Sequence, residues 1–270
     1  MKRRNLLALA AVAPLLAAAK PLLAATRITQ QVKSDAHRDF VLVHGAFHGG
    51  WCWQKVADTL RSQGNRVFTP TFTGLGDRAH LLNDNIDLNT FIQDVSAVIE
   101  WEELNNVVLV GHSFGGYVIS GVADRMPERV GSLVYLDAPM GSNGMSVLDE
   151  APEDVRTARL KAAISLSGTR AISAPSSTNF GVSNPDQVAW VDRRMTPMPL
   201  KSYNTPLVLK SPPGGDLPKL FIRCTNPALP NIEPAGLYAR KHGWSYTEIA
   251  TGHDAMVTKP EEVAKVLMAS

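Results

Sequence analysis

The sequence has few of the features that indicate a metal protein or a nucleic-acid-binding protein. It contains two cysteines, Cys52 and Cys224, and neither belongs to a C-x-x-C pair or a His/Cys cluster of the kind that binds zinc. Charged residues make up 19% of the chain, and no basic tract with interleaved aromatic residues indicates binding to DNA or RNA. We therefore expect no metal site, no nucleic-acid partner and two buried, unpaired thiols.

Residues 1–25 read as an export signal rather than as part of a fold. Lys2-Arg3-Arg4 precedes an Ala/Leu-rich run, which is the pattern of a secretory signal. The order Arg3-Arg4-Asn5-Leu6-Leu7 resembles a twin-arginine signal and predicts export to the periplasm or the medium. Lys20 interrupts the apolar run, so we expect no stable membrane span after cleavage. The alternative is an uncleaved N-terminal anchor.

The remainder of the 270 residues alternates short apolar β-forming runs with segments of helical spacing. This alternation predicts an α/β fold with a mostly parallel sheet and helices on both faces. The expected strands are Phe40–Val43, Asn65–Pro70, Val107–Val110, Ser132–Asp137, Lys219–Cys224 and Trp244–Ile249.

One segment departs from this alternation and divides the predicted core. Residues 141–212 are rich in Pro, Ser and Met, with helical pieces expected near Glu150–Ser167 and Asn184–Met195. We interpret this segment as a helical cap that is inserted between the two parts of the core, 26–140 and 213–270.

A G-x-S-x-G pentapeptide, Gly111-His112-Ser113-Phe114-Gly115, joins one predicted strand to the following helix. This strand–turn–helix context is what gives the pattern its meaning, because a sharp turn there holds the serine hydroxyl clear of the sheet. Glycines on both sides let the strand and the helix pass closely. Ser113 is therefore the predicted nucleophile; the alternative is a chance match in a Gly-rich loop.

A nucleophilic serine needs a base and donors for the oxyanion. His253 follows the last predicted strand, at the same sheet edge as Ser113, and is the predicted general base. The predicted oxyanion donors are the backbone N–H groups of Phe114, which follows the nucleophile, and of Ala46, in the loop after the first strand.

The acid of a Ser–His–acid triad is less easily assigned. The loop after the strand before last, residues 224–230, contains no Asp or Glu. Asp137 ends the strand next to that of Ser113, and a carboxylate at a buried strand end needs a partner such as His253. We therefore predict Asp137 as the acid. The alternative is that Asp137 caps a turn and that Asn226, a water or Glu233 orients His253.

Three motifs together resemble the α/β-hydrolase superfamily: Phe40-Val-Leu-Val-His-Gly-Ala-Phe-His-Gly-Gly-Trp-Cys-Trp53, Leu109-Val-Gly-His-Ser-Phe-Gly-Gly116 and Gly252-His-Asp-Ala-Met256. The similar branch contains plant methylesterases, hydroxynitrile lyases and bacterial carboxylesterases. The resemblance implies a Ser–His–acid triad, no cofactor, a small-molecule ester as substrate, and a cap over an apolar pocket. Plant relatives generally carry the acid in the loop that here lacks one.

The resemblance also distinguishes an esterase from two alternative functions. The lyases carry a Thr where this chain has Gly45, and a Lys where it has Asp254, so an esterase is favoured over a lyase. A non-catalytic receptor on this fold is a further alternative, against which the intact Ser113 and His253 argue. Further candidates for the substrate pocket are Gly45, His48, His112, Met140 and Trp190. The alternative for the last four is a structural or packing role.

Overall fold

The structure is a computed structural model that describes residues 37–166 and 168–270. The predicted export segment, 1–25, and the first residues of the predicted core, 26–36, lie outside the described residues. Within the described part, no helix combines the length and the apolar character needed to cross a membrane.

Parallel strands in the order β2-β1-β3-β4-β8-β9 form the central sheet. Their bounds are Asp39–Val43 for β1, Arg66–Phe68 for β2, Val107–His112 for β3, Val130–Leu136 for β4, Lys219–Cys224 for β8 and Ser245–Ile249 for β9. Because all neighbouring pairs are parallel, the carboxyl ends of the strands meet at one edge, where ligands bind in such sheets. The predicted fold class is confirmed.

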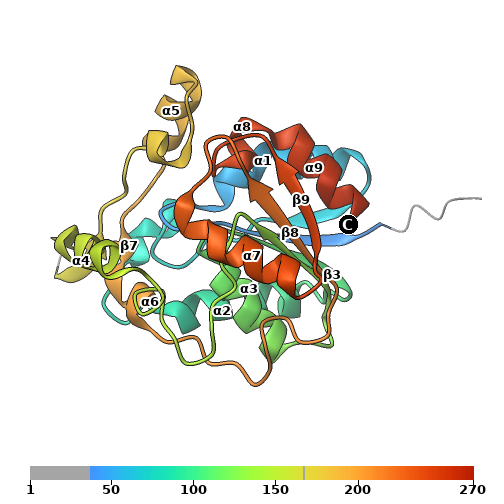
Figure 1. Cartoon of the computed structure of the whole chain (residues 1–270), viewed down its shortest axis with the longest axis horizontal. Helices are drawn as coiled ribbons and strands as arrows, with labels where there is room; N and C mark the ends of the chain where they lie inside the picture. Colours follow the sequence, from blue (N-terminus) through green and yellow to red (C-terminus); the bar gives the residue numbers. More distant parts are fainter. Residues whose placement is uncertain (1–36, 167) are drawn as a thin grey trace, which may run out of the picture. The chain divides into compact units, whose positions relative to one another are not determined.

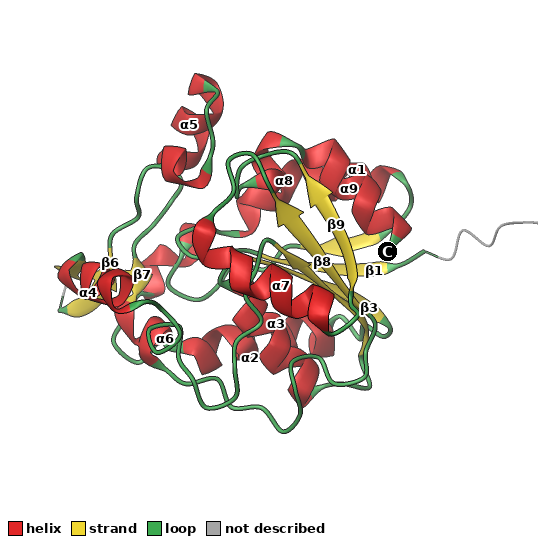
Figure 2. Cartoon of the chain, viewed as in Figure 1, coloured by secondary structure: helices red, strands yellow, loops and turns green. Residues whose placement is uncertain are grey.

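Helices cover both faces of this sheet because successive strand residues point to opposite sides. Val41 and Leu109 pack into one core with α2, α3 and α7, whereas Leu42 and Val110 pack into the other with α1, α8 and α9. Figure 2 shows these two groups of helices on opposite sides of the strands. Their bounds are Gln54–Ser62 for α1, Leu88–Trp101 for α2, Gly115–Arg125 for α3, Glu233–Lys241 for α7, Ala255–Thr258 for α8 and Pro260–Ala269 for α9.

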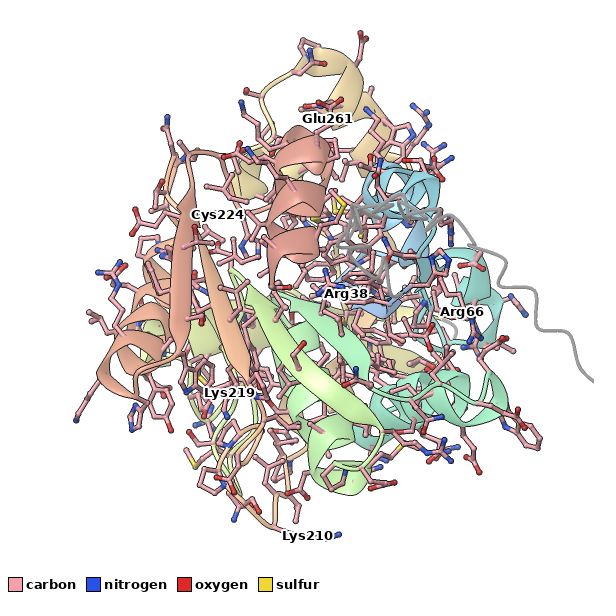
Figure 3. All side chains as sticks on the ribbon, turned by 90° about the vertical axis from the view of Figure 1, so that its right-hand side faces the viewer. Arg38, Arg66, Lys210, Lys219, Cys224 and Glu261 are labelled. Carbon is pink, nitrogen blue, oxygen red and sulfur yellow. The ribbon has the colours of Figure 1, made fainter. Side chains whose placement is uncertain are left out.

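Polar contacts fix the ends of two of these helices. At the start of α2, Asp87 accepts a hydrogen bond from Thr90 N at 3.1 Å, and the Thr90 hydroxyl accepts from Asp87 N at 3.2 Å. At the end of α9, the Arg38 guanidinium donates to the carbonyls of Leu267 and Met268, both at 2.8 Å. Figure 3 shows Arg38 beneath this helix. The first residues of the sheet are thereby tied to the last helix.

The cap contains strands as well as helices. Between β4 and β8 lie α4 (Glu153–Lys161), β5 (Ala163–Leu166), β6 (Thr169–Ile172), α5 (Pro185–Asp192), β7 (Met198–Pro199) and α6 (Leu200–Asn204). The helix predicted near Glu150–Ser167 is wrong in its second half, because Ala163–Leu166 pairs antiparallel with β6. Gly168, with a φ of 89°, permits the tight reversal that makes this hairpin.

Candidate active site

Ser113 occupies the sharp turn between β3 and α3. Its φ of 52° is left-handed, a conformation that costs a non-glycine residue about 1–3 kcal/mol. The neighbouring glycines make the turn possible. A Cβ on Gly115 would lie 2.9 Å from the carbonyl oxygen of His44, and one on Gly111 would lie 2.7 Å from that of Gly115. The structure thus places Ser113 in the strained strand–turn–helix context that the motif indicates.

His253 and Asp137 follow β9 and β4, so both lie at the sheet edge that carries Ser113. The Nδ1 atom of His253 lies 2.7 Å from Oδ2 of Asp137, and both side chains are buried. A carboxylate accepts hydrogen bonds, so Nδ1 carries the hydrogen and Nε2 is left to take a proton. This arrangement matches that of a base and its orienting acid.

Ser113 and His253 line the same cavity. Across residues 37–166 and 168–270, no hydrogen bond of 3.5 Å or less joins the Ser113 hydroxyl to His253. Such bonds are often long in unliganded enzymes and tighten when substrate binds.

Three donors converge on Asp137. Besides His253, the Arg223 guanidinium donates to its Oδ1 at 2.6 Å, and the backbone N–H of Cys224 donates at 3.0 Å. Burial acts to raise the pKa of Asp137, but the hydrogen bond and charge of His253, together with the bonds from Cys224 and Arg223, hold it below its usual value. Asp137 is therefore an ionised acceptor at the pH where His253 must be oriented.

The alternative partners of His253 have other contacts. The Glu233 carboxylate lies 3.5 Å from Arg223 and is 55% exposed, whereas the backbone N–H of Asn226 donates to Thr251 O. In the described part of the chain neither residue makes a hydrogen bond to the His253 side chain, so Asp137 is the carboxylate that the fold brings to the imidazole.

Two backbone N–H groups are available next to Ser113. Phe114 precedes the first residue of α3, and Ala46 lies in the turn after β1. In the portion that the structure describes, neither N–H donates to another protein group. Ala46 lines the same cavity as Ser113. Unpaired donors at such a place are what an oxyanion hole requires.

His44 holds the peptide that carries the Ala46 N–H. Its Nε2 accepts a hydrogen bond from Phe72 N at 3.1 Å, so its Nδ1 donates to the carbonyl of Gly45 at 2.7 Å. Burial lowers the pKa of His44 to about 3, so the ring is neutral at ordinary pH. Gly45 itself is packed tightly, since a Cβ there would lie 2.9 Å from the Ser113 Cβ. The neutral His44 ring therefore holds the loop from one side, and the packing on the other side leaves no room for a side chain at Gly45.

His48 and Asp254 form a second buried pair beside the first. The Nε2 atom of His48 lies 3.2 Å from Oδ2 of Asp254, and its Nδ1 lies 2.8 Å from Ala46 O. Both partners are acceptors, so the imidazolium satisfies both bonds. Burial acts to lower the pKa of His48, but the charge and hydrogen bond of Asp254 outweigh it and raise the pKa. The charged pair anchors the carbonyl of Ala46.

His112 is held between the two pairs. Its Nε2 donates to the carbonyl of His253 at 3.0 Å, and its ring lies 4.5 Å from that of His253 between centroids. Burial, followed by the nearby charge of His253, lowers the pKa of His112 to about 3. His112 is thus a neutral residue that holds the backbone of the base.

The Ser113 cavity has a volume of about 340 Å³ and a mainly apolar wall. Besides Ser113, His253 and Ala46, its lining consists of Phe47, His48, His112, Ala158, Arg159, Ala162, Ile172, Ser173, Pro175, Phe180, Tyr203, Leu229 and Asn231. Cap residues and core loops together line it.

Three predicted pocket residues are not part of this lining, and Gly45, which packs tightly beneath Ser113, is one of them. Met140 lines a larger neighbouring cavity of about 770 Å³. Trp190 lines a separate cavity with Cys52 and Met256, and its ring packs edge-on against Trp51 at 5.0 Å. The expectation that these three residues line the Ser113 cavity is corrected, because α5 carries Trp190 toward α8 rather than over the nucleophile.

Sequence reasoning missed three residues of this site: Arg223, Asp254 as the partner of His48, and His44 as the holder of the Gly45 carbonyl. Arg223 has a visible signal, because it is a charged residue within the apolar strand Lys219–Cys224. The roles of Asp254 and His44 depend on contacts between distant loops and have no local signal.

The two cysteines are free and buried. Among residues 37–166 and 168–270, no group of three His, Cys, Asp or Glu side chains is arranged to hold a metal ion.

Comparisons with known proteins agree with this geometry. Residues 40–266 match the model of a family described as "Alpha/beta hydrolase family". A carbendazim hydrolyzing esterase from Nocardioides sp. (strain SG-4G) is 42% identical over 239 residues, which cover 86% of this chain and 98% of that protein. A pyrethroid hydrolase from Sphingobium wenxiniae is 34% identical over 110 residues, 40% of this chain and 38% of that protein.

Solved structures show the same similarity. An extracellular alpha/beta-hydrolase from a Paenibacillus species, described as sharing structural and functional homology with Tobacco Salicylic Acid Binding Protein 2, superposes with a TM-score of 0.75. It is 26% identical to this chain, and the match covers 86% of this chain and 98% of that one.

Proposed function

The chain belongs to the alpha/beta hydrolase family, and on that premise we propose that it is a serine esterase that cleaves carboxylic esters through an acyl-enzyme. The observation that carries the proposal is the convergence on one cavity of Ser113, the His253–Asp137 pair and the unpaired Ala46 N–H. The 42% identity to an esterase over most of both chains supports the same reaction.

The chemistry proceeds in two halves. The Ser113 hydroxyl attacks the ester carbonyl while His253 Nε2 takes its proton, and the resulting imidazolium is stabilised by Asp137. The oxyanion accepts hydrogen bonds from the N–H groups of Ala46 and Phe114. Collapse of the tetrahedral intermediate expels the alcohol, which takes the proton from His253. A water then attacks the acyl carbonyl while His253 takes its proton; the bond to Ser113 Oγ breaks, His253 returns the proton to Ser113, and the carboxylic acid leaves.

The cavity favours small to medium substrates with an apolar surface. Aromatic and aliphatic side chains make up most of its wall, including Phe47, Ile172 and Phe180. Such walls bury apolar surface while a few polar groups fix orientation.

A lyase is not favoured. Asp254 stands where lyases of the resembling branch carry a lysine, and its side chain is fully buried against His48. It therefore presents no cation to a substrate. Gly45 has no hydroxyl, which those lyases supply from a threonine.

We also propose that the protein acts outside the cytoplasm. The order of residues 1–25, with its twin-arginine pattern, supports export to the periplasm or the medium. To test this, the wild-type chain and the double variant Arg3→Lys, Arg4→Lys are expressed, and the amount of protein in the periplasmic and cytoplasmic fractions is measured for each. Wild-type protein confined to the cytoplasmic fraction would contradict export, and an equal periplasmic share for both forms would contradict the twin-arginine route.

The esterase proposal is tested with short-chain p-nitrophenyl esters. We expect wild-type protein to hydrolyse them and Ser113→Ala to lose that activity, whereas Ser62→Ala, at an exposed serine in α1, keeps it. Hydrolysis by Ser113→Ala at the wild-type rate would overturn the proposal.

A further inference from the structure

Arg159 lies on α4 at the boundary of two cavities. It lines both the Ser113 cavity and the larger cavity of about 770 Å³, as does Asn231. Arg159 and Asn231 are the residues that the two linings share, so a ligand long enough to occupy both cavities would lie against them.

A chain of ring contacts fixes Arg159 relative to the nucleophile. Its guanidinium carbon lies 5.1 Å from the centroid of the Tyr203 ring, and this ring lies 5.3 Å from that of Phe114. Phe114 directly follows Ser113. The Arg159 guanidinium thus stacks on Tyr203 rather than extending into solvent, and Tyr203 in turn contacts Phe114, the residue after the nucleophile.

The guanidinium has its donors available. In the part of the chain that the structure describes, Arg159 makes no side-chain hydrogen bond and no ion pair within 4.0 Å, although it is partly buried. Arg223, by contrast, donates hydrogen bonds to Asp137, to the Leu229 carbonyl and to Glu233. An arginine fork matches the geometry of a carboxylate and binds it with two parallel bonds.

The charge on the wall of the Ser113 cavity is also uncompensated. No Asp or Glu lines that cavity. Glu150 lines the larger cavity instead, where its carboxylate accepts a hydrogen bond from the Tyr117 hydroxyl. Two positive groups therefore lie on the wall of the Ser113 cavity: the His48 imidazolium, which is paired with the buried Asp254, and Arg159, which has no such partner among the described residues.

We propose that Arg159 forms an anion subsite and that the substrates of this enzyme are esters carrying a carboxylate away from the scissile bond. The inference rests on the proposed esterase function, because it assigns a substrate class to the same cavity. Apolar walls accept the body of such a substrate, and Arg159 binds its far end.

Two series of chromogenic esters test this. In the first, the carboxylate is in the acyl half: mono-p-nitrophenyl esters of straight-chain dicarboxylic acids of increasing length, each paired with the p-nitrophenyl ester of the monocarboxylic acid of equal length. In the second, it is in the alcohol half: butyrate esters of 3-carboxy-4-nitrophenol, paired with p-nitrophenyl butyrate. The measured quantity is the ratio of kcat/KM for the anionic ester to that for its neutral partner.

We expect this ratio to exceed one for wild-type protein in at least one series, and to fall about ten- to a hundredfold in Arg159→Gln, the range for a lost hydrogen-bonded ion pair. Arg159→Lys keeps the charge without the fork and should give an intermediate ratio. Arg156→Gln, at an exposed arginine of the same helix that lines neither cavity, should keep the wild-type ratio.

Failure of the two proposals can be told apart. If wild-type protein hydrolyses the neutral esters through Ser113 but prefers them in both series, or if Arg159→Gln leaves both ratios unchanged, the anion subsite is wrong and the esterase stands. The wild-type preference needs no variant, so a misfolded Arg159→Gln does not prevent the test. If Ser113→Ala hydrolyses the neutral esters like wild type, the esterase itself is wrong.

Discussion

The guanidinium of Arg223 donates a hydrogen bond to Oδ1 of Asp137 over 2.6 Å, and both side chains are buried. The other carboxylate oxygen of Asp137 accepts from His253 at 2.7 Å. Hydrogen bonds thus hold both carboxylate oxygens of Asp137, and Arg223 affects His253 through Asp137. Burying two charges is costly, but removing one partner costs more, because the other is left unpaired.

Replacing Arg223 should therefore affect both stability and catalysis. We expect Arg223→Met to lower the free energy of unfolding by about 3–5 kcal/mol. Loss of a positive charge favours the imidazolium form of His253, so the acidic limb of the kcat/KM profile should move to higher pH. Arg223→Lys keeps the positive charge, so it should lose less stability and shift the profile less than Arg223→Met does. Urea unfolding and pH-rate profiles measure them; an unchanged profile in folded Arg223→Met would reduce Arg223 to a structural role.

Asp137→Asn tests the acid directly. An amide cannot stabilise the imidazolium and favours the wrong tautomer, so we expect kcat to fall by roughly 10⁴, with the far-UV circular dichroism unchanged. Glu233→Gln, at the carboxylate that the sequence offered as the alternative, should have a small effect because Glu233 is 55% exposed and contacts Arg223 rather than His253. If kcat falls strongly in Glu233→Gln and only slightly in Asp137→Asn, Asp137 is not the acid.

Ser113→Gly should stabilise the fold while it removes activity. Glycine adopts the φ of 52° without steric cost, so we expect a gain of about 1 kcal/mol relative to Ser113→Ala, which keeps a Cβ in the strained turn. Thermal melting of the two inactive variants measures the difference. An alanine variant as stable as the glycine variant would contradict a strained turn.

The protein should lose stability as the pH falls from about 6.5 toward 3. Burial lowers the pKa of His44 and of His112 from 6.5 to about 3, so the unfolded chain binds protons in this range that the folded chain does not. The lowered pKa values of Asp137 and Asp254 add to the loss as the pH falls below their unfolded values.

His48 has the opposite effect, because its pKa is raised. Its contribution to stability is present in full below its unfolded value of 6.5 and is lost as the pH rises through the folded value. Because the pKa is lowered for two buried histidines and raised for one, we expect a lower Tm at about pH 4.5 than at pH 7. In His44→Asn the fall in Tm over this range should be smaller. A Tm that is constant over this range would show that the buried histidines take up protons freely.

Local patterns in the chain were sufficient for the sheet and for the positions of the chemistry. Short, continuous Val/Leu runs such as Val107–Val110, set between helical segments, indicate buried strands, and strands of one direction place their following loops at one edge. Ser113 and His253 could therefore be assigned to the same edge. The strand Ala163–Leu166 was misassigned because its hairpin partner, not its own short sequence, makes it a strand.

The amino-acid order thus defined the fold class and the motif that carries Ser113, since both depend on periodicity and on short spacings. The fold was needed to bring Asp137 to His253, 116 residues away, to place Arg223 behind Asp137, and to join His48 to Asp254. The fold also placed Trp190 in a separate cavity and put Arg159 on the wall of the Ser113 cavity. These pairings arise from register between neighbouring strands and from the packing of distant loops, which no local pattern contains.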